Sequence, residues 1–199
     1  MLTEDGSDQA RSNLQWQLLW RVRLSNLYHL KRERFLDGAD KTSKAISALG
    51  SGAAFMQIKS NPDIGLWITA LIALVATLSL VYSPASKARK HAELARDFKR
   101  LEAEISDHGA EITVALLAKF ESKYLGIESS EPATLGALTT HCHNQLSTAY
   151  EKYDQITPLP WHQNIFMNWF DFDQSVPITN TRTVPISDSH SPADVSPPK

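Results

Sequence analysis

An uncharged apolar stretch of twenty residues, Ile64 to Ser83, constrains this chain more than any other feature. It reads IGLWITALIALVATLSLVYS and lies between Asp63 and Pro84. At a helical rise of about 1.5 Å per residue, it spans roughly 30 Å, which is the thickness of the hydrocarbon core of a bilayer. We therefore predict a membrane-spanning helix around which the rest of the chain is arranged.

The composition of the remaining chain sets limits on function. The 199 residues carry a formal charge of −2, which provides no bulk attraction to nucleic acid. The single cysteine, Cys142, excludes an internal disulfide and a zinc site built from several cysteines. Residues 1–13 are polar, do not resemble a secretory signal peptide, and are expected to form a disordered leader. Residues 174–199, rich in Ser, Thr, Pro and Asp, are expected to form a disordered C-terminal tail.

The segment 14–44 predicts a basic amphipathic helix. Residues 14–37 contain neither Gly nor Pro, and apolar side chains recur at helical spacing along one face. We expect this helix to pack on its neighbours with a solvated basic face, with contact of Trp16 and Trp20 with anionic headgroups as a second interpretation and nucleic-acid binding as a third. Residues 38–44 form either a charged hinge or a continuation of the helix. The basic residues of the helix are Arg21, Arg23, Lys31, Arg32 and Arg34.

A second apolar segment, Ala45 to Ile58, precedes the first one. It is uncharged for fourteen residues and rich in small side chains, which allow helices to approach closely in lipid. Because it is short, we expect a short first transmembrane helix, with a re-entrant or interfacial segment and a segment outside the membrane as alternatives. The turn at 60–63 then makes residues 45–83 a two-transmembrane helical hairpin. Its predicted packing residues are Ala48, Gly50, Gly52 and Ala53.

Basic residues flank the predicted hairpin on both sides, whereas the turn between its arms carries only Lys59. The positive-inside rule then predicts a multi-pass protein of the inner (cytoplasmic) membrane with both termini in the cytoplasm.

The region 84–173 is expected to form long cytoplasmic helices that assemble into a helical bundle, which makes the fold class all-α. Further helices are predicted at Ala110–Leu125 and from Pro132 to about Asp154. The aromatic segment 158–172 is expected either to cap the helical core or to sit in the membrane interface as an anchor. A coiled seam, through which the helix packs on its neighbours or self-associates, is predicted at His91, Leu94, Phe98, Leu101 and Ile105.

Residues suited to catalysis are not apparent in the sequence. His141, Cys142 and His143 form the only cluster of potential metal ligands, but side chains two positions apart on a helix diverge by about 200°. We therefore predict no enzyme activity, no metal site and no cofactor. His91, close to the membrane, is expected to be either a satisfied interface residue or a pH-sensitive group at a pore mouth.

The order of these features resembles a known family. A basic helix rich in Trp and Arg, two close-set apolar segments, KHAELARDFKRLEAEI after the second and EPATLGALTTHCHNQL later are similar to bacterial SLATT-type two-transmembrane proteins, the effector domains associated with SMODS and SLOG domains. The resemblance covers roughly residues 14–172. It implies an effector of a bacterial conflict system whose helix pairs form a membrane pore when a nucleotide-linked sensor triggers it. Because no sensing domain is fused to this chain, it also implies a nucleotide-sensing partner protein.

Three functions are open at this point. The first is a membrane-embedded helical effector that forms a pore as a homo-oligomer. The second is a membrane-anchored helical scaffold that recruits a partner without forming a pore. The third is a soluble helical bundle with Ile64–Ser83 as its central helix. The first two have the lipid bilayer as a partner, and none of them predicts binding to nucleic acid.

Overall fold

The computed structural model describes residues 4–109 and 112–172, except for the side chains at positions 4–7, 53–55, 57 and 59. This described part of the chain is predominantly helical and contains no strand, which confirms the all-α fold class. The predicted tail at 174–199 lies outside the described residues.

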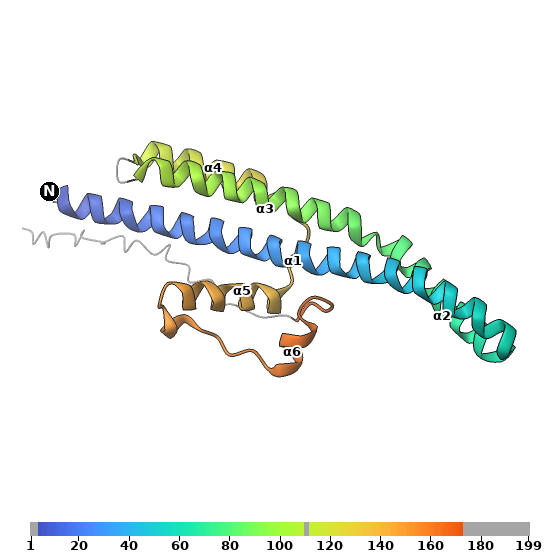
Figure 1. Ribbon diagram of the computed structural model, residues 1–199. Helices are drawn as coiled ribbons and strands as arrows, with labels where there is room; N and C mark the ends of the chain where they lie inside the picture. The colour runs from blue at the N-terminus through green and yellow to red at the C-terminus, as the bar shows by residue number, and fades with distance from the viewer. Residues whose placement is uncertain (1–3, 110–111, 173–199) are drawn as a thin grey trace, which may run out of the picture.

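One long helix, α1 (Glu4–Ser60), forms the axis of the molecule (Figure 1). Its 57 residues correspond to a length of about 85 Å. The helix begins within the stretch 1–13 that we expected to be a leader, and it passes through 38–44 as a continuation rather than a hinge. Glycines inside a helix cost up to about 1 kcal/mol each, but packing against other helices along α1 offsets this cost.

Two further helices bring the chain back along α1. Helix α2 (Pro62–Tyr82) follows the single non-helical residue Asn61, and α3 (Pro84–Asp107) follows Ser83. Each helix begins with a proline, whose missing N–H costs no hydrogen bond in the first turn. Ser83 adopts φ 48°, a left-handed conformation that separates α2 from α3. Both helices run antiparallel to α1, and the tip of the α1–α2 hairpin projects beyond the other helices (Figure 1).

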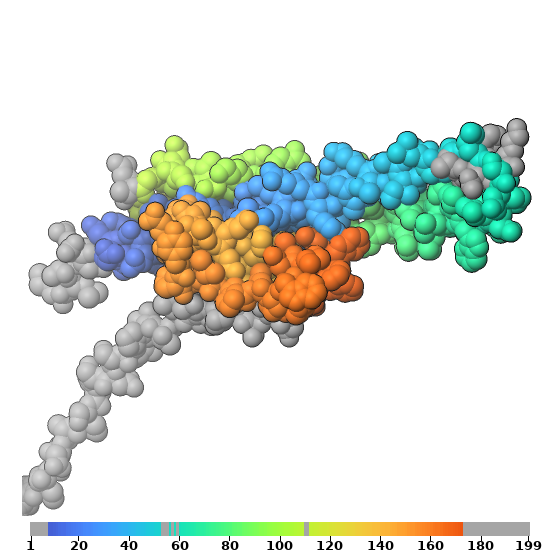
Figure 2. Space-filling view, turned by 60° about the horizontal axis from the view of Figure 1, so that its bottom comes forward, coloured from blue at the N-terminus to red at the C-terminus, as the bar shows by residue number. Residues whose placement is uncertain are grey.

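The remaining helices lie on two sides of α1, away from the tip of the hairpin. Helix α4 (Val114–Glu128) packs on α3 and α1, whereas α5 (Gly136–Ala149) packs on the other side of α1. The chain then continues through a short 3-10 helix, η2 (Tyr153–Gln155), to α6 (Trp161–Phe166). Figure 2 shows α5 and the segment around α6 together on one face of the molecule.

The chain between α4 and α5 differs from the sequence prediction. We expected a helix from Pro132, but residues 131–135 are not helical and α5 begins at Gly136. The backbone N–H of Leu135 donates a hydrogen bond to the hydroxyl of Tyr28 at 3.0 Å. Glu131 lies against α1 in the same segment. Contacts with α1 therefore hold this segment in place of a helical turn.

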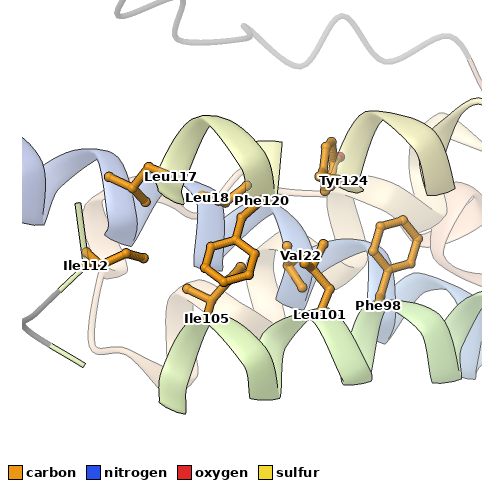
Figure 3. Packing of buried hydrophobic residues seen from close by; sticks show 9 residues of the cluster. All are labelled: Leu18, Val22, Phe98, Leu101, Ile105, Ile112, Leu117, Phe120 and Tyr124. Atoms are coloured by element: carbon orange, nitrogen blue, oxygen red, sulfur yellow. The ribbon is translucent and has the colours of Figure 1, made fainter. Parts of the chain in front are cut away.

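The main hydrophobic core lies where α1, α3 and α4 meet (Figure 3). Phe98 and Ile105 of α3 are fully buried there, and Val22 supplies the facing position on α1. In Figure 3, Phe120 reaches from α4 towards Ile105 of α3. The complete cluster is Leu18, Val22, Phe98, Leu101, Ile105, Ile112, Leu117, Phe120 and Tyr124.

The basic residues of α1 are largely used to hold the bundle together. Arg21 pairs with Glu121 of α4, and Arg23 pairs with Glu102 of α3 at 2.8 Å. The Arg23 guanidinium also donates to the hydroxyl of Tyr150 beyond α5. Because these partners come from three different parts of the chain, the basic face of α1 serves packing within the molecule.

Candidate functional site

The α1–α2 hairpin exposes an extensive apolar surface at one end of the molecule. Trp67 is 77% exposed and Leu80 is 79% exposed, although both are large apolar side chains. Among the described residues, one helical stretch is long and apolar enough to cross a membrane, and its apolar part is α2. Only 6% of its most apolar 18-residue window is buried. An apolar surface of this extent marks a contact with a membrane or with another protein.

The two arms of the hairpin meet along a narrow seam. The least exposed residues of α2 alternate three and four positions apart, which is the spacing of a coiled-coil interface. At the bundle end, the hydroxyls of Ser43 and Ser79 form a hydrogen bond of 2.9 Å. The seam residues of α2 are Gly65, Ile68, Ile72, Val75 and Ser79.

Two glycines make the close approach of the arms possible. A Cβ atom at Gly50 of α1 would lie 2.8 Å from Cδ1 of Ile72. A Cβ atom at Gly65 of α2 would lie 2.8 Å from the backbone Cα and N of Ile58, which cannot move aside as a side chain can. Contact at both glycines shows that the end of α1 and α2 pack as a pair.

The predicted packing residues occupy different places in this hairpin. Gly50 lies in the seam, opposite Ile72. Ala48 and Gly52 lie on the exposed side of α1, and a Cβ atom at Gly52 would meet nothing within 4 Å. The side chain of Ala53 lies outside the described residues.

Polar groups within the hairpin find partners in its own helices. The hydroxyls of Ser51, Thr69 and Thr77 each donate to the carbonyl four residues earlier. At the bundle end of the hairpin, Lys44 pairs with Asp40 at 2.6 Å. Satisfied hydroxyls inside the hairpin and paired charges at its edge suit a segment that leaves water.

Tyr82, the last residue of α2, marks the bundle end of the apolar surface. The ammonium of Lys87 lies 3.4 Å from the centre of its ring, and Arg32 of α1 donates to its hydroxyl at 3.4 Å. Trp67 lies near the opposite end of α2. Aromatic residues near both ends of an apolar helix are typical of segments that cross a bilayer.

The predicted coiled seam of α3 is buried throughout. Its five residues face α1 and α4 within the molecule rather than solvent, so this chain itself covers the seam. Three of them, Phe98, Leu101 and Ile105, belong to the main core. Leu94 is 2% exposed, and His91 is 6% exposed and contacts a second histidine.

His29 and His91 form a buried pair between α1 and α3. Their Nδ1 atoms lie 2.8 Å apart, and the His29 ring stacks on Phe98 at a centroid distance of 5.7 Å. A hydrogen bond between two Nδ1 atoms requires one proton, so a second proton would break it. Burial, together with the nearby charges of His29 and Arg32, lowers the pKa of His91 from its usual 6.5 to about 4.

Glu131 completes this polar cluster from the segment before α5. Its Oε1 atom lies 3.1 Å from Nε2 of His29, although the two atoms are outside hydrogen-bonding geometry. Of these three residues, only His91 is predicted from the sequence to be a candidate; His29 and Glu131 are not. In the sequence, the pair Glu131-Pro132 is typical of the first turn of a helix, and this pattern gives no indication that Glu131 contacts a histidine of α1.

The His141-Cys142-His143 cluster is divided among separate contacts. His141 faces Lys31 at 3.5 Å, whereas His143 packs edge-on against Trp20. Cys142 is fully buried, and burial raises the pKa of its thiol to about 12. In the described part of the chain, no group of three or more His, Cys, Asp or Glu side chains could hold a metal ion.

Comparison with known proteins finds no matching family model, no matching curated protein and no matching solved structure. The resemblance to SLATT-type proteins therefore stays a prediction from the sequence.

Proposed function

We propose that the α1–α2 hairpin is inserted in a bilayer and that the protein is a membrane-anchored helical scaffold. The observation that carries this proposal is the exposed apolar surface of α2, where Leu66, Trp67 and Leu80 are each at least 69% exposed. A core helix of a soluble bundle would bury such a surface against its neighbours. This contrast disfavours the soluble bundle in which Ile64–Ser83 is the central helix.

The end of α1 accompanies α2 as the second arm of the proposed two-transmembrane hairpin. The uncharged segment 45–58 is about 21 Å long, which is shorter than the hydrocarbon core. Lys44 and Lys59 lie at its two ends, where long side chains reach the interface. The seam with α2 extends from Gly65, beside Ile58, to Ser79, beside Ser43, so α1 accompanies α2 beyond the uncharged segment.

The proposed orientation places the bundle and both termini in the cytoplasm, at the inner membrane. The bundle helices α3, α4 and α5 all lie beyond the same end of the hairpin (Figure 1). Basic residues are concentrated at that end, at 31–44 on α1 and 87–90 on α3, whereas the Asn61 turn lies at the opposite end. This asymmetry follows the positive-inside rule.

A scaffold needs only the single hairpin that the structure describes, whereas a pore would need several copies to associate. Ile68, Ile72 and Val75 of α2 fill the seam between the arms. The bundle, in addition, presents an exposed face of α4 to a partner in the cytoplasm.

A pore-forming effector, assembled as a homo-oligomer, is the second candidate. The observation that favours it is the small-residue face at Ala48 and Gly52, which α2 leaves uncovered. Small residues four positions apart allow transmembrane helices to associate closely. This candidate also agrees with the resemblance to SLATT-type effectors and with their nucleotide-sensing partners.

Membrane insertion is tested by adding a charge to the centre of α2. Ala73→Lys should reduce the fraction of protein that resists alkaline extraction from membranes, because a lysine at the centre of a span costs about 2.5–3.5 kcal/mol. Ala103→Lys, at an exposed position of α3, is the matched control and should leave extraction unchanged. Recovery of the unaltered protein in the soluble fraction without detergent would contradict the proposal.

Orientation is tested with cysteines and a membrane-impermeant maleimide. Asn61→Cys should be labelled in cells with a permeabilised outer membrane, whereas Lys90→Cys should be labelled only after lysis. The buried native Cys142 should give a low background, because its high pKa leaves almost no thiolate. Labelling of both positions from the same side would refute the hairpin.

A pore is distinguished from a scaffold by the membrane potential of cells that express the protein. A pore would be selected if the unaltered protein dissipates the membrane potential and Gly52→Leu does not, because the bulky side chain would block helix association. An intact potential at high expression would select the scaffold.

A further inference from the structure

The segment around α6 exposes a second apolar surface, separate from the hairpin. Trp161 is 74% exposed and Trp169 is 65% exposed, and neighbouring side chains are also apolar and exposed. Such a concentration of aromatic surface marks an interaction site. We call it the aromatic platform, and it consists of Trp161, Ile165, Phe166, Trp169 and Phe170.

Contacts with α1 fix the platform beside the bundle end of the hairpin. The ring of Trp169 packs edge-on against Phe35 at a centroid distance of 5.1 Å. The guanidinium of Arg32 donates through Nη1 to the carbonyl oxygen of Asn168. The same guanidinium donates through Nη2 to the hydroxyl of Tyr82. One side chain therefore links the platform to the last residue of α2.

The position of these contacts along α1 gives the depth of the platform relative to a bilayer. Ser43 lies beside Ser79, so Tyr82 is level with about residue 40 of α1. Phe35 then lies about 7.5 Å beyond the end of the span, on the bundle side. The headgroup region on each side of the hydrocarbon core is about 5–8 Å thick. The platform is thus level with the headgroups of the leaflet that the bundle faces.

The chemistry of the platform suits this depth. Tryptophan is enriched at membrane interfaces, because its ring is apolar and its N–H group remains hydrated. The only charged residue between 161 and 172 is Asp171, and its carboxylate accepts a hydrogen bond from the N–H of Gly136. The acidic group is therefore engaged with α5, and the five exposed side chains are uncharged.

We propose that the aromatic platform is a second lipid contact, seated in the headgroup region of the leaflet that the bundle faces. This inference rests on the proposed insertion of the hairpin and goes beyond it. Because the platform projects from one side of α1 only, its contact with the headgroups adds a lateral anchor beside the hairpin and favours a tilt of α1 towards that side.

Tryptophan fluorescence in vesicles tests the proposal on the full chain. The vesicles contain phosphatidylcholine and phosphatidylglycerol, with or without phosphatidylcholine brominated high on its acyl chains. A platform variant retains Trp161 and Trp169 and carries Phe at positions 16, 20 and 67. A span variant retains only Trp67, and a core variant retains only Trp16 and Trp20, which pack near Tyr150. Circular dichroism checks that each variant keeps its helical content.

We expect the brominated lipid to quench the platform variant about as strongly as the span variant, and the core variant little. In the platform variant, Phe170→Asp should reduce quenching because it places a charge among the aromatic rings. Val114→Asp replaces another exposed apolar side chain, on α4. It is the matched control and should leave the quenching unchanged.

The outcomes separate this inference from the proposed function. Quenching of the span variant without quenching of the platform variant would overturn only the proposed lipid contact of the platform. A second copy, another segment or water would then cover these side chains. Absence of quenching in the span variant would overturn the inserted hairpin, and the platform proposal with it.

Discussion

The burial of His91 in the His29–His91 pair predicts how much the free energy of unfolding falls in acid. Because the pKa of His91 is about 4 in the folded protein and 6.5 ordinarily, the unfolded chain binds more protons between these values. The free energy of unfolding is therefore fully maintained above pH 6.5 and falls as the pH drops towards 4. For these two pKa values, the loss between pH 7 and pH 5 is about 2 kcal/mol.

The perturbation that isolates this effect is His91→Asn. An asparagine amide sits close to the position of Nδ1 and keeps a polar partner for His29, but it does not titrate in this range. We expect the variant to lose the part of the pH dependence that His91 supplies. His108→Asn is the matched control, because it removes an exposed histidine from the end of the same helix and should keep the original pH dependence.

The assay is thermal unfolding of the full chain in detergent, followed by circular dichroism at pH 7 and pH 5. A change of about 2 kcal/mol corresponds to a shift in Tm of about 4–8 °C for a chain of this size. The difference between the shifts of the original protein and His91→Asn should have this magnitude. An equal shift in both proteins would refute the reasoning, and so would an increase in stability of the original protein at pH 5.

Three further predictions concern single side chains. Gly65→Ala should loosen the hairpin and lower the Tm, because its Cβ would meet the backbone of α1, whereas Gly52→Ala has open space and should not lower it. Tyr28→Phe should cost about 0.5–1.5 kcal/mol in urea unfolding, through loss of the hydrogen bond from the N–H of Leu135; an unchanged midpoint would contradict that role. Cys142 should resist maleimide at pH 7 until denaturant is added, and rapid labelling of the native protein would show that its thiol is accessible.

The helices of this fold could be predicted from the sequence where periodicity or length specifies them. The uncharged run at 64–83 predicted α2 to within a few residues, and the alternating spacing from His91 to Ile105 picked out the face of α3 that is buried. Both signals are local, since they depend on the distribution of apolar side chains within one helix.

The continuity of α1 could not be predicted in the same way. Gly38 and the small residues around Gly50 weaken a helix locally, and the sequence therefore left a hinge open. Packing of α2 and α3 along α1 decides the conformation instead. Glu131 is a similar case, because its proximity to His29 depends on two segments that are about a hundred residues apart.

Ser83 gives the molecule a mechanical asymmetry. The first connection between the hairpin and the bundle is α1, an unbroken helix that behaves as a stiff rod over this length. The second connection contains a joint at Ser83, where a non-glycine residue is held at φ 48° at a cost of about 1–2 kcal/mol. If the hairpin tilts, the rigid α1 would therefore tilt the bundle by the same angle. Any bending between α2 and α3 would be concentrated at Ser83.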